Sequence, residues 1–239
     1  MSSAPESTAQ PLALITGASR GLGAALAEEL AAQGWHVVAV ARTTGALEEL
    51  DDRIQARGGS ATLAPLDITQ DDALRHLCRS IHDRWGRVDL WAHTAVNAPP
   101  LSPAGHVAIK DWDRALAVTL RATGVLIPMV EPLLRASGRG TALFFDDPAT
   151  RDEGGATRKF WGAFGAAKAG QIALARAWAT ECTALGPERA PRIVIESPLP
   201  MPTATRARFF PGEPRDTLAR PRDEATRILR AALAQQTIG

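Results

Sequence analysis

The sequence contains no tyrosine, and only 5% of its 239 residues are aromatic. Any site that uses a phenolic hydroxyl as an acid or base is therefore excluded from this chain. Cysteine is almost as scarce: Cys78 and Cys182 are the two present, and both fall in helix-like segments. We expect them to be buried free thiols, as is typical of a reducing compartment, rather than a disulfide or metal ligands.

Neither charge sign is in clear excess, because 27 Lys and Arg residues face 26 Asp and Glu residues, for a formal net charge of +1. The charges are scattered, which argues against nucleic acid or an anionic membrane as a partner. No run approaches the roughly 18 consecutive apolar residues of a membrane span. The polar start MSSAPESTAQP also lacks the features of a secretory signal. We therefore expect a cytoplasmic protein.

Six short apolar runs alternate with helix-like segments. The runs, which predict strands, are residues 11–16, 35–41, 61–66, 88–92, 141–145 and 192–196. The predicted helices lie in residues 17–34, 45–57, 69–84, 112–137, 160–182 and 221–236. This alternation implies right-handed βαβ crossovers and a parallel sheet with helices on both faces. We predict a single α/β domain with a Rossmann-type doubly wound sheet over residues 11–239, after a disordered tail at residues 1–10.

Two segments depart from this regular pattern. Pro128 and Pro132 lie in the later half of the 112–137 helix and should kink or split it. Residues 198–214 are rich in proline, arginine and phenylalanine without a clear period, which predicts a mobile loop with at most a short helix. This loop and residues 97–110 would shape a pocket for a small apolar substrate. Its expected apolar lining includes Trp112, Phe209 and Phe210.

A glycine-rich turn joins the first predicted strand to the first helix. Residues 16–23 read TGASRGLG, where Gly17, Gly21 and Gly23 allow a tight turn and a close approach of a pyrophosphate to the helix N-terminus. Such turns also serve packing alone, so the triplet by itself is a weak signal. Its place between the first strand and helix of a doubly wound sheet favours a dinucleotide site.

Phe164 and Lys168 stand one helical turn apart in the 160–182 segment and should project together into one cleft. The surrounding run, WGAFGAAK, and the T-G-x-x-x-G-x-G spacing from Thr16 resemble the short-chain dehydrogenase/reductase superfamily, in particular its compact ketoacyl-reductase-like members. The resemblance runs from about Leu12 to Thr203. It implies a nicotinamide nucleotide bound by Thr16, Gly17, Ser19, Arg20, Gly21, Leu22, Gly23, Arg42, Asp67, Ile68, Lys168 and Thr203.

The end of the second strand bears on the choice between NAD(H) and NADP(H). An acidic residue there would accept hydrogen bonds from a ribose 2′-hydroxyl, but this chain has Ala41 and Arg42. Together with Arg20 on the glycine turn, Arg42 would suit a 2′-phosphate. The alternative for either arginine alone is a solvated surface residue. We expect NADP(H) rather than NAD(H), and no metal.

The resemblance also implies a catalytic set of tyrosine, lysine, serine and asparagine, of which this chain keeps only Lys168. Phe164 stands at the tyrosine position, Asp146 or Asp147 at the serine position, and Thr119 at the asparagine position. His93 begins the run that matches an N-N-A-G motif. A carboxylate at the serine position would repel the negative charge that develops on a substrate oxygen.

Each replacement has alternative interpretations. Phe164 can fill space beside a nucleotide, and the two aspartates can pair with Lys168 or cap a loop. His93 can be a satisfied, hydrogen-bonded imidazole, or a substitute acid or base acting with an aspartate. Three functions follow: a catalytically impaired NADP(H)-binding homologue that acts as a sensor or partner subunit, an active oxidoreductase with non-standard acid–base residues, or an interaction module without a cofactor.

Self-association is expected from the resemblance, although the seventh strand of the family pattern has no counterpart in the sequence. The 112–137 and 160–182 helices remain available for a homodimer with C₂ symmetry, and a tetramer is possible. Small residues in the second helix would allow close approach: Gly162, Gly165, Ala166, Ala167, Ala169 and Gly170.

Overall fold

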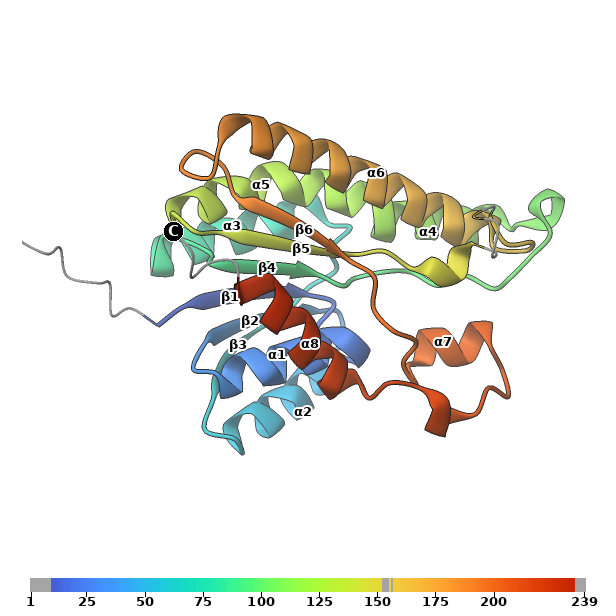
Figure 1. Cartoon of the computed structure of the whole chain (residues 1–239), viewed down its shortest axis with the longest axis horizontal. Coiled ribbons are helices and arrows are strands. Elements are labelled where there is room, and N and C mark those ends of the chain that lie inside the picture. The colour runs from blue at the N-terminus through green and yellow to red at the C-terminus, as the bar shows by residue number, and fades with distance from the viewer. Residues whose placement is uncertain (1–9, 152–154, 156, 235–239) are drawn as a thin grey trace, which may run out of the picture.

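The computed structural model describes residues 10–151, 155 and 157–234, and shows one α/β domain built on a six-stranded parallel sheet (Figure 1). The strands are β1 (Leu12–Thr16), β2 (His36–Ala41), β3 (Ser60–Pro65), β4 (Leu90–His93), β5 (Thr141–Phe145) and β6 (Arg192–Glu196). Their order is β3-β2-β1-β4-β5-β6, which confirms the predicted doubly wound sheet. Apart from Gln10, the expected tail at residues 1–10 lies outside the described residues.

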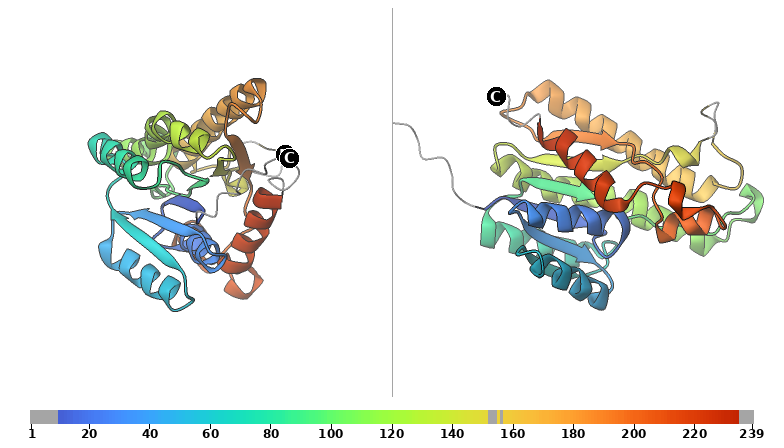
Figure 2. Two further views of the ribbon diagram at one scale, coloured as in Figure 1. Left: turned by 90° about the vertical axis from the view of Figure 1, so that its left-hand side faces the viewer. Right: turned by 60° about the horizontal axis from the view of Figure 1, so that its bottom comes forward.

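Helices cover both faces of the sheet (Figures 1 and 2). One layer holds α1 (Gly21–Ala32), α2 (Thr44–Gln55) and α8 (Pro221–Ala234). The other holds α3 (Asp71–Trp85), α4 (Ile109–Ala115), α5 (Ala122–Ala136) and α6 (Gly162–Leu185). The short α7 (Ala204–Phe209) lies beyond the carboxyl ends of the strands, and 3₁₀ turns occur at Ala104–His106, Pro148–Thr150 and Arg215–Thr217.

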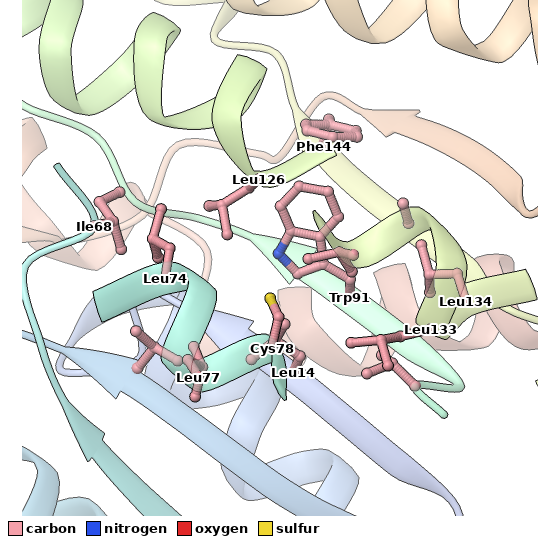
Figure 3. Close-up of a cluster of buried hydrophobic side chains, with 14 of the residues drawn as sticks. Leu14, Ile68, Leu74, Leu77, Cys78, Trp91, Leu126, Leu133, Leu134 and Phe144 are labelled. Atoms are coloured by element: carbon pink, nitrogen blue, oxygen red, sulfur yellow. The ribbon is translucent and has the colours of Figure 1, made fainter. Parts of the chain in front are cut away.

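The two layers bury separate hydrophobic clusters against the sheet, because side chains alternate between the faces of each strand. In Figure 3, side chains of α3 and α5 gather around Trp91 of β4. The Trp91 ring is fully buried and meets Phe144 edge-on, with ring centroids 5.4 Å apart. Both faces of the sheet are therefore closed, which leaves its carboxyl edge for a ligand.

The segment predicted as one helix over residues 112–137 begins at Ile109 and contains a π-helical stretch, Leu116–Arg121, between α4 and α5. Of the predicted kink or split at Pro128 and Pro132, the split is wrong, because α5 continues through both residues. These prolines and Gly124 lie on the exposed side of α5, where water can bond the carbonyls that lack a partner.

By length and composition, Ile109–Ala136 is one helix among the described residues that could cross a membrane. It contains no run of 18 consecutive apolar residues, because Arg121 and Glu131 interrupt it. Its buried side chains, among them Leu126 and Val130, belong to the hydrophobic core. A core helix of this kind is a common cause of such a signal.

Two local predictions are confirmed. The 198–214 segment contains a single short helix, α7. Cys78 and Cys182 are free and buried, and burial raises the pKa of both thiols to about 11.

Candidate active site

A cleft of about 490 Å³ opens at the carboxyl edge of the sheet, between the strand ends and α7. The turn after β1, the ends of β2, β4 and β5, the first turns of α1 and α6, and α7 all contribute to its lining. In doubly wound sheets ligands bind at this edge. The order of the strands reverses between β1 and β4, and the connections that leave these strands in opposite directions open a crevice there.

The glycine turn forms one wall of the cleft. Gly17 has a φ of 89°, and a Cβ atom there would stand 2.7 Å from the backbone nitrogen of Ala95. A Cβ on Gly23 would stand 2.3 Å from the carbonyl oxygen of Gly17. Both positions therefore require glycine for the turn to pack against the loop after β4. Gly21 has a φ of 59° and lies close to Thr203 at the start of α7.

The N-terminus of α1 faces this wall without a side-chain cap on its backbone N–H groups, and its first turn holds no acidic residue. Such a terminus attracts an anionic group through its N–H groups and the helix dipole. Ser19, Leu22 and Gly23 line the cleft beside it, as predicted. Thr16 does not: its hydroxyl lies in the interior, 2.6 Å from Nδ1 of His93. Its expected contact with a nucleotide has no support in this geometry.

Arg20 and Arg42 both line the cleft and are exposed. Neither forms an ion pair with a carboxylate in the part of the chain that the structure describes. The two predicted guanidinium groups are therefore brought to the same opening and are available to an anion. Metal ligation has no comparable support, since the described residues hold no group of three or more His, Cys, Asp or Glu side chains suited to an ion.

Asp67 and Ile68 line the same end of the cleft. The Asp67 carboxylate accepts hydrogen bonds from the Thr69 backbone N–H and hydroxyl and pairs with Arg114 at 2.8 Å. Burial alone would raise the pKa of Asp67, but these hydrogen bonds and the charge of Arg114 lower it. Its carboxylate is thus ionised and held in place, and the Arg114 pairing was not predicted.

At the opposite end, Phe164 projects into the cleft from α6 and is 2% exposed. Its ring packs against Trp161 and Phe209, with centroids 6.0 and 5.0 Å away. Phe210 completes the aromatic wall against Trp161, at 5.7 Å. The predicted apolar lining is confirmed for Phe209 and Phe210. Trp112 instead lies partly exposed on α4 and is not among the lining residues.

Lys168 lies one turn after Phe164 on the same face and also lines the cleft. Its Nζ atom donates to the backbone carbonyl of Phe145 and, at 2.8 Å, to Oε1 of Gln171. Burial lowers the pKa of Lys168 to about 8, against the opposing charges of Asp147 and Asp146. Of the two alternatives for the aspartates, a direct pairing with Lys168 is absent among the described hydrogen bonds and ion pairs.

The two aspartates after β5 both line the cleft but serve different local contacts. Asp146 pairs with Arg151 through an Oδ2 contact of 2.6 Å, while Asp147 caps the following 3₁₀ turn by accepting from the Ala149 N–H. Burial would raise the pKa of Asp146, but hydrogen bonds from Arg151, its charge and that of Lys168 lower it. The site therefore carries an ionised carboxylate beside Phe164 and Lys168.

His93 lines the cleft but is almost completely buried, and both ring nitrogens have hydroxyl partners. Nδ1 lies 2.6 Å from the hydroxyl of Thr16, and Nε2 lies 2.9 Å from that of Thr123. Burial, with the charge of Lys168, lowers the pKa of His93 to about 3. The geometry matches the satisfied imidazole and not the substitute acid.

Thr119 lies in the π-helical stretch, fully buried and outside the cleft lining. Its hydroxyl accepts from the Asn97 N–H at 3.1 Å. Its carbonyl accepts from Thr123 and from Gln171, two residues that the sequence analysis did not identify. Gln171 stands three residues after Lys168 on the same helix face, so the helix geometry that linked Phe164 and Lys168 at i, i+4 could also have found it.

Thr203 caps α7 by accepting from the Arg206 N–H, and its side chain lines the cleft. The cleft thus brings together all the predicted nucleotide-binding residues except Thr16. They are the residues of the glycine turn, both arginines, Asp67, Ile68, Lys168 and Thr203. The uncapped helix and the glycines that tolerate no Cβ fit a dinucleotide at this site.

Comparison with known proteins agrees with this geometry. The family model described as short chain dehydrogenase matches residues 11–208. A short-chain dehydrogenase/reductase of Hericium erinaceus is 31% identical over 189 residues, which cover 75% of this chain and 70% of that protein. A fatty acyl-CoA reductase of Acinetobacter baylyi is 42% identical over 84 residues, 35% of this chain and only 28% of that protein.

Among solved structures, a metagenomic short-chain oxidoreductase in complex with NADP superposes with a TM-score of 0.76 at 26% identity. The match covers 93% of this chain and 90% of that one.

Proposed function

The chain belongs to the short-chain dehydrogenase family, and from this premise we propose that it binds NADP(H) but is catalytically impaired, acting as a nucleotide sensor or as a partner subunit. One observation carries the proposal: the buried ring of Phe164, packed against Phe209, occupies the tyrosine position beside an otherwise complete nucleotide cradle.

The residues of the cradle have distinct roles in this proposal. The turn at Gly17 and Gly21 and the N-terminus of α1 would hold the pyrophosphate. Lys168 would bond the ribose hydroxyls next to the nicotinamide, and Thr203 the nicotinamide amide. The bound nucleotide supplies or accepts a hydride, while the protein contributes position and charge.

Preference for the 2′-phosphate form rests on Arg20 and Arg42. Both guanidinium groups are exposed, line the cleft and lack a carboxylate partner among the described residues. A phosphate can accept charge-assisted hydrogen bonds from both, whereas a ribose hydroxyl uses neither charge. The name of the NADP-bound relative is consistent with this preference.

Catalysis is impaired in this proposal because the side chains at the tyrosine and serine positions, and His93, cannot donate a proton to a substrate oxygen. Phe164 has no titratable group, and His93 is neutral with both nitrogens bonded. Asp146 is paired with Arg151, and its negative charge opposes charge development on a substrate oxygen. Loss of acid–base help typically lowers a rate by about 10² to 10⁴-fold.

A second candidate is an active oxidoreductase with non-standard acid–base groups, and one observation favours it. Burial lowers the pKa of Lys168 to about 8, so this ammonium group can release a proton near neutral pH. A substrate oxygen close to Nζ would then receive the proton from Lys168 in place of a tyrosine. The substitution of Lys168 by Met would abolish turnover in that case.

Self-association through α5 and α6 is also part of the proposal. The outer faces of these helices expose small or apolar residues, including Gly124, Pro128, Ala166, Ala169 and Ala173. Gly170, by contrast, lies against Leu120 within the same chain. We expect a homodimer with C₂ symmetry, or a tetramer, and Ala169→Arg should release monomers in sedimentation equilibrium. An unchanged mass would contradict this interface.

Nucleotide binding is tested by titrating the protein with NADPH while following tryptophan fluorescence, since Trp161 lies in the cleft. We expect saturable quenching with NADPH at micromolar concentrations and a weaker response to NADH. A Gly17→Val variant serves as the control with a disrupted nucleotide site, because the valine side chain would collide with the loop after β4. The lack of saturation at millimolar NADPH would overturn the proposal and favour an interaction module without a cofactor.

A further inference from the structure

Gln171 connects the cleft lysine to the buried interior of the protein. It stands one turn after Lys168 on α6 and is 1% exposed. Its Oε1 atom accepts a hydrogen bond of 2.8 Å from Nζ of Lys168, whose second bond goes to the Phe145 carbonyl. An ammonium group has three N–H donors, so these contacts leave one for a ligand in the cleft.

The other end of the Gln171 amide is held just as firmly. Its Nε2 atom donates to the carbonyl of Thr119 and to the hydroxyl of Thr123, both at 3.0 Å. The two N–H groups of the amide are therefore both used, and this fixes which end of the side chain faces Lys168. Only the oxygen can face the ammonium group without loss of these bonds.

The bonds beyond Thr123 can all be satisfied with one arrangement of protons. The Thr123 hydroxyl donates to the Thr119 carbonyl and accepts from Nε2 of a neutral His93. Nδ1 of His93 then accepts from the Thr16 hydroxyl, which accepts from the indole N–H of Trp91. Every donor in this chain is used once. The donors therefore run in a single direction, from Trp91 through Thr16, His93 and Thr123 to the Thr119 carbonyl, which also accepts from the amide of Gln171.

We propose that Gln171 is the positioning residue of Lys168: its amide, anchored to Thr119 and Thr123, holds the ammonium group with one N–H free toward the cleft and closes the route by which a proton could pass from Lys168 to the interior. The amide of Gln171 does not titrate near neutral pH, so it links Lys168 to Thr119 and Thr123 without taking up or releasing a proton itself.

The inference rests on the proposed function in one respect only. That function supplies the group that the free N–H of Lys168 would bind, a ribose hydroxyl of the nucleotide. The charged and titratable groups that face Lys168 are Asp146 and Asp147 at the end of β5 and His93 at the end of β4. Arg151 neutralises Asp146 from the opposite side. The effect of a substitution at Gln171 on the Lys168 pKa must therefore be measured with Asp146, Asp147, Arg151 and His93 unchanged.

Lysine NMR can isolate this residue, because Lys110, Lys159 and Lys168 are the lysines of the sequence. The pKa of Lys168 is read from its ¹³Cε shift during a pH titration of the full-length protein without nucleotide. We expect a value near 8 in the wild type. Gln171→Leu removes an acceptor that favours the charged form and moves the pKa down. Gln171→Glu places a carboxylate there and moves it up by about one pH unit or more.

Thr123→Val is the matched control for the rest of the buried network. It removes the hydroxyl that accepts from Gln171 and from His93, but it leaves the contact between Lys168 and Gln171 and the bond of Gln171 to Thr119. Its Lys168 pKa should equal that of the wild type. A purely structural role would lower the stability of the Gln171 variants without moving the Lys168 titration, and an unchanged pKa in folded Gln171→Glu would overturn the proposal.

Addition of NADPH to the same samples separates this inference from the proposed function. A shift of the Lys168 signal in the wild type supports the contact with ribose. If the Gln171 variants move the pKa as expected but NADPH shifts no lysine signal, the proposed nucleotide function fails and the positioning role of Gln171 stands.

Discussion

The ring of Phe209 on α7 lies 5.0 Å, centroid to centroid, from the ring of Phe164 on α6, and both side chains are buried. The space next to the tyrosine position is therefore filled by the protein itself. Because Thr203, the N-cap of α7, lies beside Gly21 of the glycine turn and Phe209 ends α7, one short helix joins the glycine turn to the aromatic wall.

Phe209→Ala should remove the ring that packs against both Trp161 and Phe164 in the aromatic wall. We expect the free energy of unfolding to fall by about 3 kcal/mol, because a buried ring is replaced by a cavity. Leu199→Ala is the control, since that side chain is 54% exposed and its loss should change stability by less than about 1 kcal/mol. Urea unfolding measures both. Equal effects in the two variants would contradict a packed aromatic wall.

Arg20→Ala and Arg42→Ala should each weaken NADPH binding and leave NADH binding nearly unchanged. Each variant loses a charge-assisted hydrogen bond to the 2′-phosphate, worth about 1.5 to 3 kcal/mol, or roughly ten-fold or more in the dissociation constant. Arg79→Ala, on the exposed side of α3, is the control for a general loss of positive charge. Calorimetric titrations with both nucleotides check this. Parallel losses for NADPH and NADH would remove the basis for the NADP(H) preference.

Phe164→Tyr alone should not create an efficient reductase. The new hydroxyl would enter a buried aromatic cluster without a described partner, so we expect a loss of about 1 to 3 kcal/mol in stability. The carboxylate of Asp146 and the fixed amide of Gln171 would still oppose proton delivery. Absorbance at 340 nm, recorded with NADPH and activated ketones, should show turnover little above the wild type. A large gain from this single change would mean that the remaining groups already suit catalysis.

Stability should depend on the protonation of His93. Because burial and the charge of Lys168 lower its pKa from 6.5 to about 3, the unfolded chain binds more protons than the folded chain between these values. The contribution of His93 to stability is therefore fully present above about pH 6.5 and is lost as the pH falls toward 3.

His93→Gln, which keeps hydrogen bonding but does not titrate, should flatten the pH dependence of stability between about pH 5 and 6.5. His36, whose pKa is lowered by burial and by Arg84, should leave a residual slope. The exposed His82→Gln variant serves as the control. Urea unfolding at several pH values provides the measurement, and a His93→Gln slope equal to that of the wild type would show that the imidazole is not buried and neutral.

The sheet could be predicted because each strand is a short apolar run, and β1, β4 and β5 are buried along their whole length, so the pattern depends on local sequence. β1 and β5, for example, were expected within one residue of their observed ends. The pair Phe164 and Lys168 was also accessible, since helix geometry fixes which residues share a face. The path of α5 through Pro128 was not, because it depends on which side of the helix meets water.

The polar contacts of the site were largely beyond sequence reasoning. Arg151 was not expected to pair with Asp146, nor Thr123 to bond His93, because such partners are set by the way in which distant elements pack. Thr16 shows how far a motif reaches. Its place in the glycine motif suggested a nucleotide contact, whereas its buried hydroxyl lies 2.6 Å from Nδ1 of His93 on the neighbouring strand β4.

The fluorescence of NADPH bound to the wild-type protein tests the central claim most directly, because one sample reports both occupancy and hydride loss. The nucleotide is titrated to saturation, and a panel of ketones and activated alkenes is then added. The account predicts a saturable rise in fluorescence that stays constant after the panel is added. No saturable rise at millimolar nucleotide, or a decay on addition of a carbonyl compound that disappears in Lys168→Met, would contradict it.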